Sequence, residues 1–457
     1  MSSLAFARVR GRSHVIRLSS VFSPLAFVAF LYVPLLLLYV VSSPSVFATD
    51  FGSRKALTWT AFAYFSLALL CFAAGAKLGA DRVLSRARGR GEQLERELAP
   101  AHERSMAVLV ESALVISVAA SMLWFALGVV RAGGIASFIE IWQSEPFRLK
   151  GEILATVPGV TTLMQLAVAA IPLAVVYGLN RRGSVVRILV VLAILLAAAR
   201  AVFFSERLAL VELLLPLAFL ALAHRRVTVS RVTVYAAALL AVVMTFFAVT
   251  ELRRTYAYTG DFSASRAATR FVGYYLTSVN NGMVVADEYP AETPFYATGE
   301  ILWRFPVVGD LRLEHLPGVG TVSFRYDDVF GVDPESFWPH AFRAEGLDYE
   351  FNVFTTPGYL AADFGWAGLV AIFVLGLASG ALFRRSRTSR LNLALYAVWV
   401  VGLFELMRIF YFADTRIFPA YLVFLAAYVI VRRPAPHGVR RAVTPGPEAR
   451  RPVRTIG

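Results

Sequence analysis

Long apolar runs alternate with short polar segments along most of this chain. A helix needs roughly 20 predominantly apolar residues to cross the hydrocarbon core of a membrane. Runs of suitable length and composition occupy residues 22–41, 56–76, 106–130, 157–178, 185–203, 206–223, 231–250, 356–382, 392–412 and 416–431. The pattern predicts an all-α, polytopic transmembrane helix bundle with about 10 spans and one large outer loop that contains short helices.

Lysine and arginine are unevenly divided between the two sides of this predicted bundle. One side, which includes both termini, carries 28 of the 45 basic residues, and the other side carries 17. Because positive residues favour the cytoplasm, both termini are predicted to be cytoplasmic. The resulting division is a basic tail (1–21), helices one to seven (22–250), a large extracytoplasmic loop (251–355), helices eight to ten (356–431) and a disordered tail (432–457).

The net charge of +14 follows mainly from this orientation. Basic cytoplasmic loops lie against anionic lipid of the inner leaflet. They are spread over separate segments without a recognisable nucleic-acid module, so nucleic acid is not an expected partner. The only cysteine, Cys71, excludes an intrachain disulfide, and no Cys/His spacing indicates a metal site.

The loop at 251–355 is too long to be a passive connection. It is rich in aromatic residues, and six prolines divide much of it into short pieces. Residues 264–282 are predicted to form a helix on the membrane face. Aromatic faces can stack on sugar rings and carboxylates can bind hydroxyls; the alternative is that these aromatics form an interfacial belt and a small core.

Ionisable residues inside apolar runs are costly and mark functional positions. Glu405 and Arg408 are three residues apart, a spacing that allows an ion pair. Five arginines fall at the predicted outer membrane boundary: Arg200, Arg207, Arg253, Arg254 and Arg416. Snorkelling explains one or two of them. Five together indicate an anionic ligand, and the guanidinium fork suits a diphosphate.

Several segments resemble the oligosaccharide repeat-unit polymerases of the Wzy type, which polymerise O-antigen. The clearest is Asn352-Val353-Phe354-Thr355 followed by Tyr359 and Asp363-Phe364-Gly365-Trp366-Ala367-Gly368. Weaker similarity covers Ser205–Leu210, Gly299–Pro306 and Arg408–Arg416. The family has about 10–14 helices and a large outer loop late in the chain, in agreement with the hydropathy pattern.

The resemblance implies polymerisation of polyprenyl-diphosphate-linked oligosaccharide repeat units at the outer face of a bacterial cytoplasmic membrane, in cell-surface polysaccharide synthesis. An acceptor hydroxyl attacks the anomeric carbon of the donor, and the diphosphate lipid leaves. Arginines can take up the leaving charge without a metal, so no metal or cofactor is expected. Donor binding is expected at the five boundary arginines together with Asn352, Asp363 and Arg408.

A base for the acceptor hydroxyl is expected in the outer loop. His340 is the first candidate because histidine side chains in general change charge near neutral pH and His340 precedes the Asn352 segment; Glu345 is the second. Other membrane proteins of polysaccharide assembly are possible partners.

Two other functional interpretations remain open. A transporter or flippase for lipid-linked glycan is one, although the matched halves typical of transporters are not visible. A GT-C-type glycosyltransferase that uses polyprenyl-phosphate sugars is the other, but the first outer loop (42–55) offers only Asp50 instead of an acidic pair.

Overall fold

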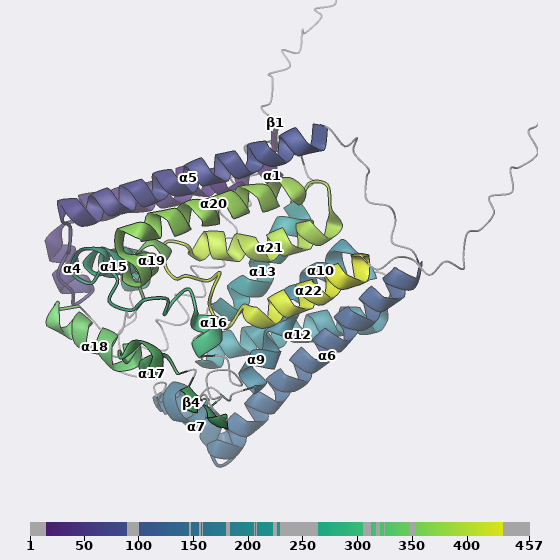
Figure 1. Cartoon of the computed structure of the whole chain (residues 1–457). Coiled ribbons are helices and arrows are strands. Elements are labelled where there is room, and N and C mark those ends of the chain that lie inside the picture. Colours follow the sequence, from purple (N-terminus) through teal and green to yellow (C-terminus); the bar gives the residue numbers. More distant parts are fainter. Residues whose placement is uncertain are drawn as a thin grey trace, which may run out of the picture.

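The protein is a helical bundle, seen here in a computed structural model (Figure 1). The structure describes residues 15–88, 100–145, 148–154, 157, 159–179, 183–204, 206, 208–222, 226–228, 264–304, 312–316, 320–323, 325–347 and 353–432. The predicted seventh span at 231–250 lies outside them, as do most of the two tails.

The first half of the chain contributes the helices α1 (Leu18–Val21), α2 (Pro24–Phe27), η1 (Val28–Tyr32), α3 (Val33–Val41), α4 (Pro44–Asp50), α5 (Trp59–Arg88), α6 (Pro100–Arg131), α7 (Ile135–Ser144), η2 (Leu149–Ile153), α9 (Val160–Met164), α10 (Leu166–Val176), α12 (Ser184–Phe204) and α13 (Leu208–Leu222). The strands β1 (Val15–Arg17) and β2 (Arg226–Thr228) pair antiparallel.

The second half contributes α15 (Ala264–Glu288), α16 (Glu300–Trp303), α17 (Tyr326–Phe330), α18 (Pro334–Ala344), α19 (Thr356–Phe364), η4 (Gly365–Ala367), α20 (Gly368–Arg385), α21 (Arg390–Glu405) and α22 (Phe418–Arg432). A short antiparallel ribbon is formed by β3 (Arg312–Leu316) and β4 (Gly320–Ser323). The helices α16, α17 and α18 lie at one end of the bundle, below α15 and α19 in the view of Figure 1.

Within the described residues, five helical segments are long and apolar enough to cross a membrane: Pro24–Val41, Trp59–Asp81, His102–Arg131, Ser184–Phe203 and Thr356–Arg385. They coincide with five of the ten predicted spans. Three more predicted spans correspond to shorter apolar helices, at Val160–Val176, Leu208–Leu222 and Phe418–Arg432. Large apolar side chains such as Phe30, Val130 and Val370 are exposed on the long helices. Such surfaces indicate a membrane protein.

The predicted span at 392–412 ends earlier than its hydropathy indicates. Helix α21 stops at Glu405, and residues 406–417 form turns before α22 begins. The carbonyl group of Glu405 accepts hydrogen bonds from the backbone of Arg408 and Ile409, at 2.7 and 2.9 Å. We call residues 406–417 the α21–α22 turn.

Helix α15 confirms the predicted helix at 264–282 but not its predicted place on the membrane face. Its segment from Leu276 to Ala286 is buried. The Asn280 side chain accepts hydrogen bonds from the Tyr39 hydroxyl and the Ala56 amide, both at 2.8 Å, and donates one to the Arg54 carbonyl at 2.9 Å. A buried polar group with several partners fixes the helix against the first outer loop.

Helices α5 and α20 run side by side with their backbones in close approach (Figure 1). Glycines permit this contact on both helices: Gly75, Gly79, Gly376 and Gly380. A methyl group added at Gly376 would lie 2.2 Å from the carbonyl oxygen of Phe72. Small residues at such positions let membrane helices pack through van der Waals contact of their backbones.

We expect Gly376→Ala to lower the thermal stability of the purified protein, because the helices must separate to admit the new methyl group. Overpacking of this kind typically costs about 1–3 kcal/mol. Thermal unfolding in detergent, followed by circular dichroism, measures the effect. Gly183→Ala is the control, since among the described residues beyond its chain neighbours the nearest atom to its added methyl group is 3.9 Å away. Equal melting temperatures for the two variants would contradict the assigned packing.

Candidate functional site

A cavity of about 450 Å³ lies where the outer-loop helices meet the start of α19 and the α21–α22 turn. This size is typical of small-molecule pockets. It is lined by Tyr296, Ala297, Glu300, Arg304, Pro334, Glu335, Trp338, Pro339, Val353, Phe354, Tyr359, Ile409, Phe410 and Asp414. The described part of the wall therefore combines aromatic rings with three carboxyl groups and one guanidinium group.

The N-terminus of α19 holds the α21–α22 turn in place. The backbone amide of Thr356 donates to the Leu406 carbonyl, and its hydroxyl donates to the Ile409 carbonyl, each at 2.9 Å. The hydroxyl of Thr355 caps the helix by accepting from the Gly358 amide at 3.2 Å. These bonds place Ile409 and Phe410 on one side of the cavity.

Asp363, near the other end of α19, holds the opposite wall. Its two carboxylate oxygens accept hydrogen bonds from the backbone amides of Ala297 and Thr298, at 3.0 and 2.7 Å. Asp363 is 2% exposed and does not line the cavity. Asp363, which was predicted to bind substrate, instead holds the segment that leads into α16.

Glu300 and Asp414 face the cavity from different walls, and their charges interact. Burial raises the pKa of Glu300, and the nearby Asp414 carboxylate raises it further, from 4.5 to about 8. Burial also raises the pKa of the Asp414 carboxyl. Two carboxyl groups that hinder each other's ionisation favour one shared proton at neutral pH.

Arg304 connects the cavity's polar groups. Its guanidinium group donates to the Tyr296 hydroxyl at 2.7 Å and pairs with Glu300 at 3.3 Å and with Glu335 at 3.5 Å. The guanidinium carbon also lies 5.5 Å from the centre of the Tyr296 ring. Arg304, the one arginine among the described lining residues, therefore already has side-chain partners in the wall.

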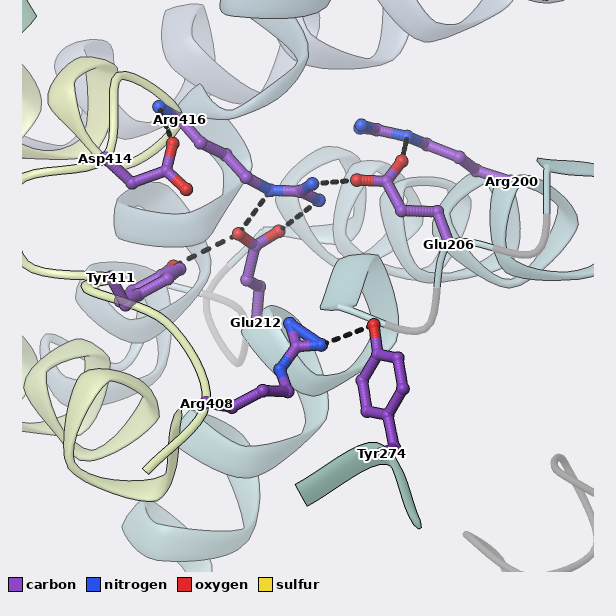
Figure 2. A network of polar contacts seen from close by, with 8 residues as sticks. All are labelled: Arg200, Glu206, Glu212, Tyr274, Arg408, Tyr411, Asp414 and Arg416. Atoms are coloured by element: carbon purple, nitrogen blue, oxygen red, sulfur yellow. Dashed lines mark hydrogen bonds and ion pairs between the residues drawn. The ribbon is translucent and has the colours of Figure 1, made fainter. Parts of the chain in front are cut away.

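A second group of charged residues lies behind the α21–α22 turn, in the interior of the bundle (Figure 2). Arg416 binds Glu212 through two parallel contacts, at 2.6 and 2.9 Å, and also pairs with Glu206. Arg200 pairs with Glu206 as well, and the Tyr411 hydroxyl lies 3.2 Å from a Glu212 oxygen. We call these residues, with Arg408 and Glu405, the buried ion-pair network.

Arg408 pairs with Glu405, which confirms the ion pair predicted from their spacing. It also donates to the Tyr274 hydroxyl at 2.7 Å and lies 4.7 Å from the centre of that ring. Arg408 is 7% exposed and Glu405 is 3% exposed. Charges this deep in a protein are found with partners because desolvation is costly.

The cavity and the buried ion-pair network are joined through Asp414. One oxygen of its carboxylate accepts from the backbone amide of Arg416 at 2.8 Å, as Figure 2 shows. The arginine that anchors the network is therefore two residues from a carboxyl group of the cavity. Arg408 likewise precedes Ile409 and Phe410 of the cavity wall.

The residues predicted as a base lie elsewhere. His340 is exposed on α18 and does not line the cavity. Glu345 pairs with Arg54 and accepts from the Tyr289 hydroxyl at 3.2 Å, so it ties the late outer segment to the first one. Of the predicted donor ligands, Arg200, Arg408 and Arg416 are brought together; Arg207, Arg253, Arg254 and Asn352 lie outside the described residues.

Sequence reasoning did not select Glu300 or Asp414 for a polar site. They stand inside the segments Gly299–Pro306 and Arg408–Arg416, which were considered for their arginines. The signal available in the sequence was a carboxyl residue in each segment. No group of three or more His, Cys, Asp or Glu that could hold a metal ion occurs among the residues that the structure describes.

No family model matches this chain, and no curated protein or solved structure is detectably similar to it. Function is therefore inferred from the residues of the cavity and of the buried ion-pair network.

We expect Glu300 to lower the stability of the protein progressively as the pH rises from about 4.5 to about 8. With a pKa raised from 4.5 to about 8, folded Glu300 keeps a proton that the unfolded chain has released, so the free energy of unfolding decreases through this interval. Glu300→Gln removes the titration. Its melting temperature should match the parent at pH 5 and exceed it at pH 8.5 by at least about 2 °C.

Glu292→Gln is the matched control for this measurement, because Glu292 is exposed in the same loop and does not line the cavity. Its melting temperature should follow that of the parent at both pH values. A Glu300→Gln variant that also follows the parent at both would show that Glu300 is ionised in the folded protein at neutral pH.

Proposed function

We propose that the protein polymerises polyprenyl-diphosphate-linked oligosaccharide repeat units at the outer face of a bacterial cytoplasmic membrane. The proposal is supported chiefly by one arrangement: a cavity with paired carboxyl groups and aromatic walls adjoins buried arginines. The resemblance of Asn352–Gly368 and the helices long enough to span a membrane agree with it. The product enters cell-surface polysaccharide.

In the proposed reaction, an acceptor hydroxyl forms a bond to the anomeric carbon of the donor glycan. The bond from that carbon to the diphosphate oxygen breaks, and the electron pair leaves with the diphosphate lipid. The proton of the hydroxyl passes to a carboxylate. We assign this base to Asp414 in place of His340 and Glu345, because Asp414 lines the cavity and they do not.

Glu300 acts beside Asp414 in its protonated form. With a pKa of about 8, it carries a proton at neutral pH and can donate a hydrogen bond that orients the acceptor. Ionisation of Glu300 at higher pH places a second negative charge beside the base. Protonation of Asp414 at lower pH removes the base, so the reaction is expected to slow on both sides of neutrality.

The leaving diphosphate is stabilised by Arg408 and Arg416 in this scheme. The contacts of Arg408 with Glu405 and Tyr274 engage two of the five N–H donors of its guanidinium group. The carboxylates hold both arginines in fixed orientations before the donor arrives. Hydrogen-bond donors that are oriented in advance stabilise a developing charge without reorganisation at the moment of reaction.

We expect the cavity to face away from the cytoplasm, since basic residues concentrate in the other loops. In a variant whose Cys71 has been replaced, a cysteine at Ser323 should react with an impermeant maleimide in intact cells or spheroplasts. A cysteine at Ser85 should react only after the membrane is permeabilised. If only the cysteine at position 85 reacts in intact cells, the protein has the opposite orientation, and the proposed function is wrong.

We expect Asp414→Asn to lower repeat-unit transfer by about 10²–10⁴-fold, the usual contribution of a general base. Arg408→Lys should transfer poorly, because lysine keeps the charge but not the planar fork. The measurement is glycan-chain elongation by the purified protein with a lipid-linked repeat unit. His340→Gln and Glu292→Gln should elongate at near the parent rate.

The same assay separates the polymerase from a transporter. A parent protein that carries the lipid-linked glycan across vesicle membranes without elongating it would be a transporter. If the Asp414→Asn variant elongates glycan at the parent rate, Asp414 is not the base. The proposed polymerase function would not be contradicted by that result.

A further inference from the structure

We infer that the cavity selects neutral or amino sugars and discriminates against glycans that carry a carboxylate, such as those ending in uronic acids. This inference rests on the proposed function for the identity of the cavity as the acceptor site. It adds the chemical class of the sugar that the site takes.

Among the described lining residues, the acidic and basic groups are the carboxyls of Glu300, Glu335 and Asp414 and the guanidinium of Arg304. Arg304 contacts both glutamates; the Glu335 carboxylate offsets its charge, while Glu300 keeps its proton at neutral pH. A carboxylate on the ligand would enter a space with excess negative charge and would lack a free cation among the described lining residues. An ammonium group would find carboxylate partners, and neutral hydroxyls can donate to them.

The two nearest arginines of the buried ion-pair network do not reverse this balance. Arg416 pairs with Glu206 and Glu212, and Arg408 pairs with Glu405. Neither arginine lines the cavity. The polarity of the site is therefore divided: carboxyl groups face the acceptor glycan, and cations lie behind the α21–α22 turn, where the diphosphate of the donor is proposed to bind.

Aromatic residues give the cavity an apolar wall of the kind that sugar rings use. The rings of Trp338 and Phe354 lie 4.9 Å apart, and those of Phe354 and Tyr359 stack at 4.0 Å. Trp338 is 7% exposed, and its indole N–H has no hydrogen-bond partner among the described residues. Buried donors usually have a partner, and a hydroxyl of the bound sugar can serve as one.

The test compares disaccharides that differ only at one terminal carbon. The purified full-length protein, in nanodiscs of zwitterionic lipid at pH 7, is offered terminal glucose against glucuronate, galactose against galacturonate, and glucosamine. Saturation-transfer NMR and competition titration measure binding without a donor lipid. We expect at least one neutral or amino sugar to bind about tenfold or more tightly than its carboxylate counterpart.

Variants assign the selectivity to the wall. Glu335→Gln and Asp414→Asn should each reduce the difference in affinity between a neutral sugar and its carboxylate counterpart, because each removes a negative charge. Glu292→Gln, exposed in the same loop but outside the cavity, should leave it unchanged. Trp338→Phe should weaken binding of the preferred sugar several-fold. The matched variant Trp303→Phe should not, since the Trp303 indole donates to the Phe295 carbonyl outside the lining.

Tighter binding of the uronate member of the pairs, equal binding of both members, or no binding of any sugar up to millimolar concentration would each overturn the inference. The outcome is separable from that of the proposed function. A protein that discriminates between the sugars but never elongates a glycan retains the inference and loses the polymerase proposal. A protein that elongates lipid-linked glycan but binds uronates equally well retains the proposal and loses the inference.

Discussion

The bidentate contact between Arg416 and Glu212 is the interaction on which the arrangement of the site depends. It joins the α21–α22 turn to α13, which is some 200 residues earlier in the chain, at a depth where Glu212 is 1% exposed. In a low-dielectric interior, loss of one partner leaves a buried charge without compensation, which typically costs about 3–5 kcal/mol. Glu206 and Tyr411 extend the contact, so the turn is fixed from several directions.

The cavity follows from this fixed turn and from the two ends of α19. Thr356, at the start of α19, is hydrogen-bonded to the turn, and Asp363, near the end of α19, accepts hydrogen bonds from residues 297 and 298. A single short helix thereby sets the distance between the wall that carries Asp414 and the wall that carries Glu300. Rigid supports of this kind are what a pair of carboxyl groups needs if their pKa values are to differ in a reproducible way.

Hydropathy alone predicted most of the helical framework, because burial in lipid requires long apolar runs whatever the neighbouring residues are. It failed at the end of α21, where Ile409, Phe410 and Phe412 continue the apolar run after the helix has stopped. The reason is tertiary: carbonyl groups of this turn are satisfied by Thr356, a partner more than 50 residues away. The sequence around residue 409 therefore could not predict this hydrogen bond or the end of the helix.

In the site, too, contacts between residues close in the sequence could be predicted, and contacts between distant segments could not. The pair Glu405–Arg408 was predictable because the two residues are only three positions apart in the sequence. The pairing of Arg416 with Glu212 and the meeting of Glu300 with Asp414 depend on segments brought together only by the fold. His340 was favoured by its residue type and its place in the chain, but it is exposed on α18 and does not line the cavity.

The glycine contact between α5 and α20 has a consequence for the making of the protein. The two helices are separated by about 280 residues of chain, and ribosomes add roughly 5–20 residues per second. Helix α5 therefore waits in the membrane for tens of seconds before its partner is synthesised. Throughout that interval its glycine groove is open to lipid and to every other nascent helix, and correct assembly requires that none of them occupies it first.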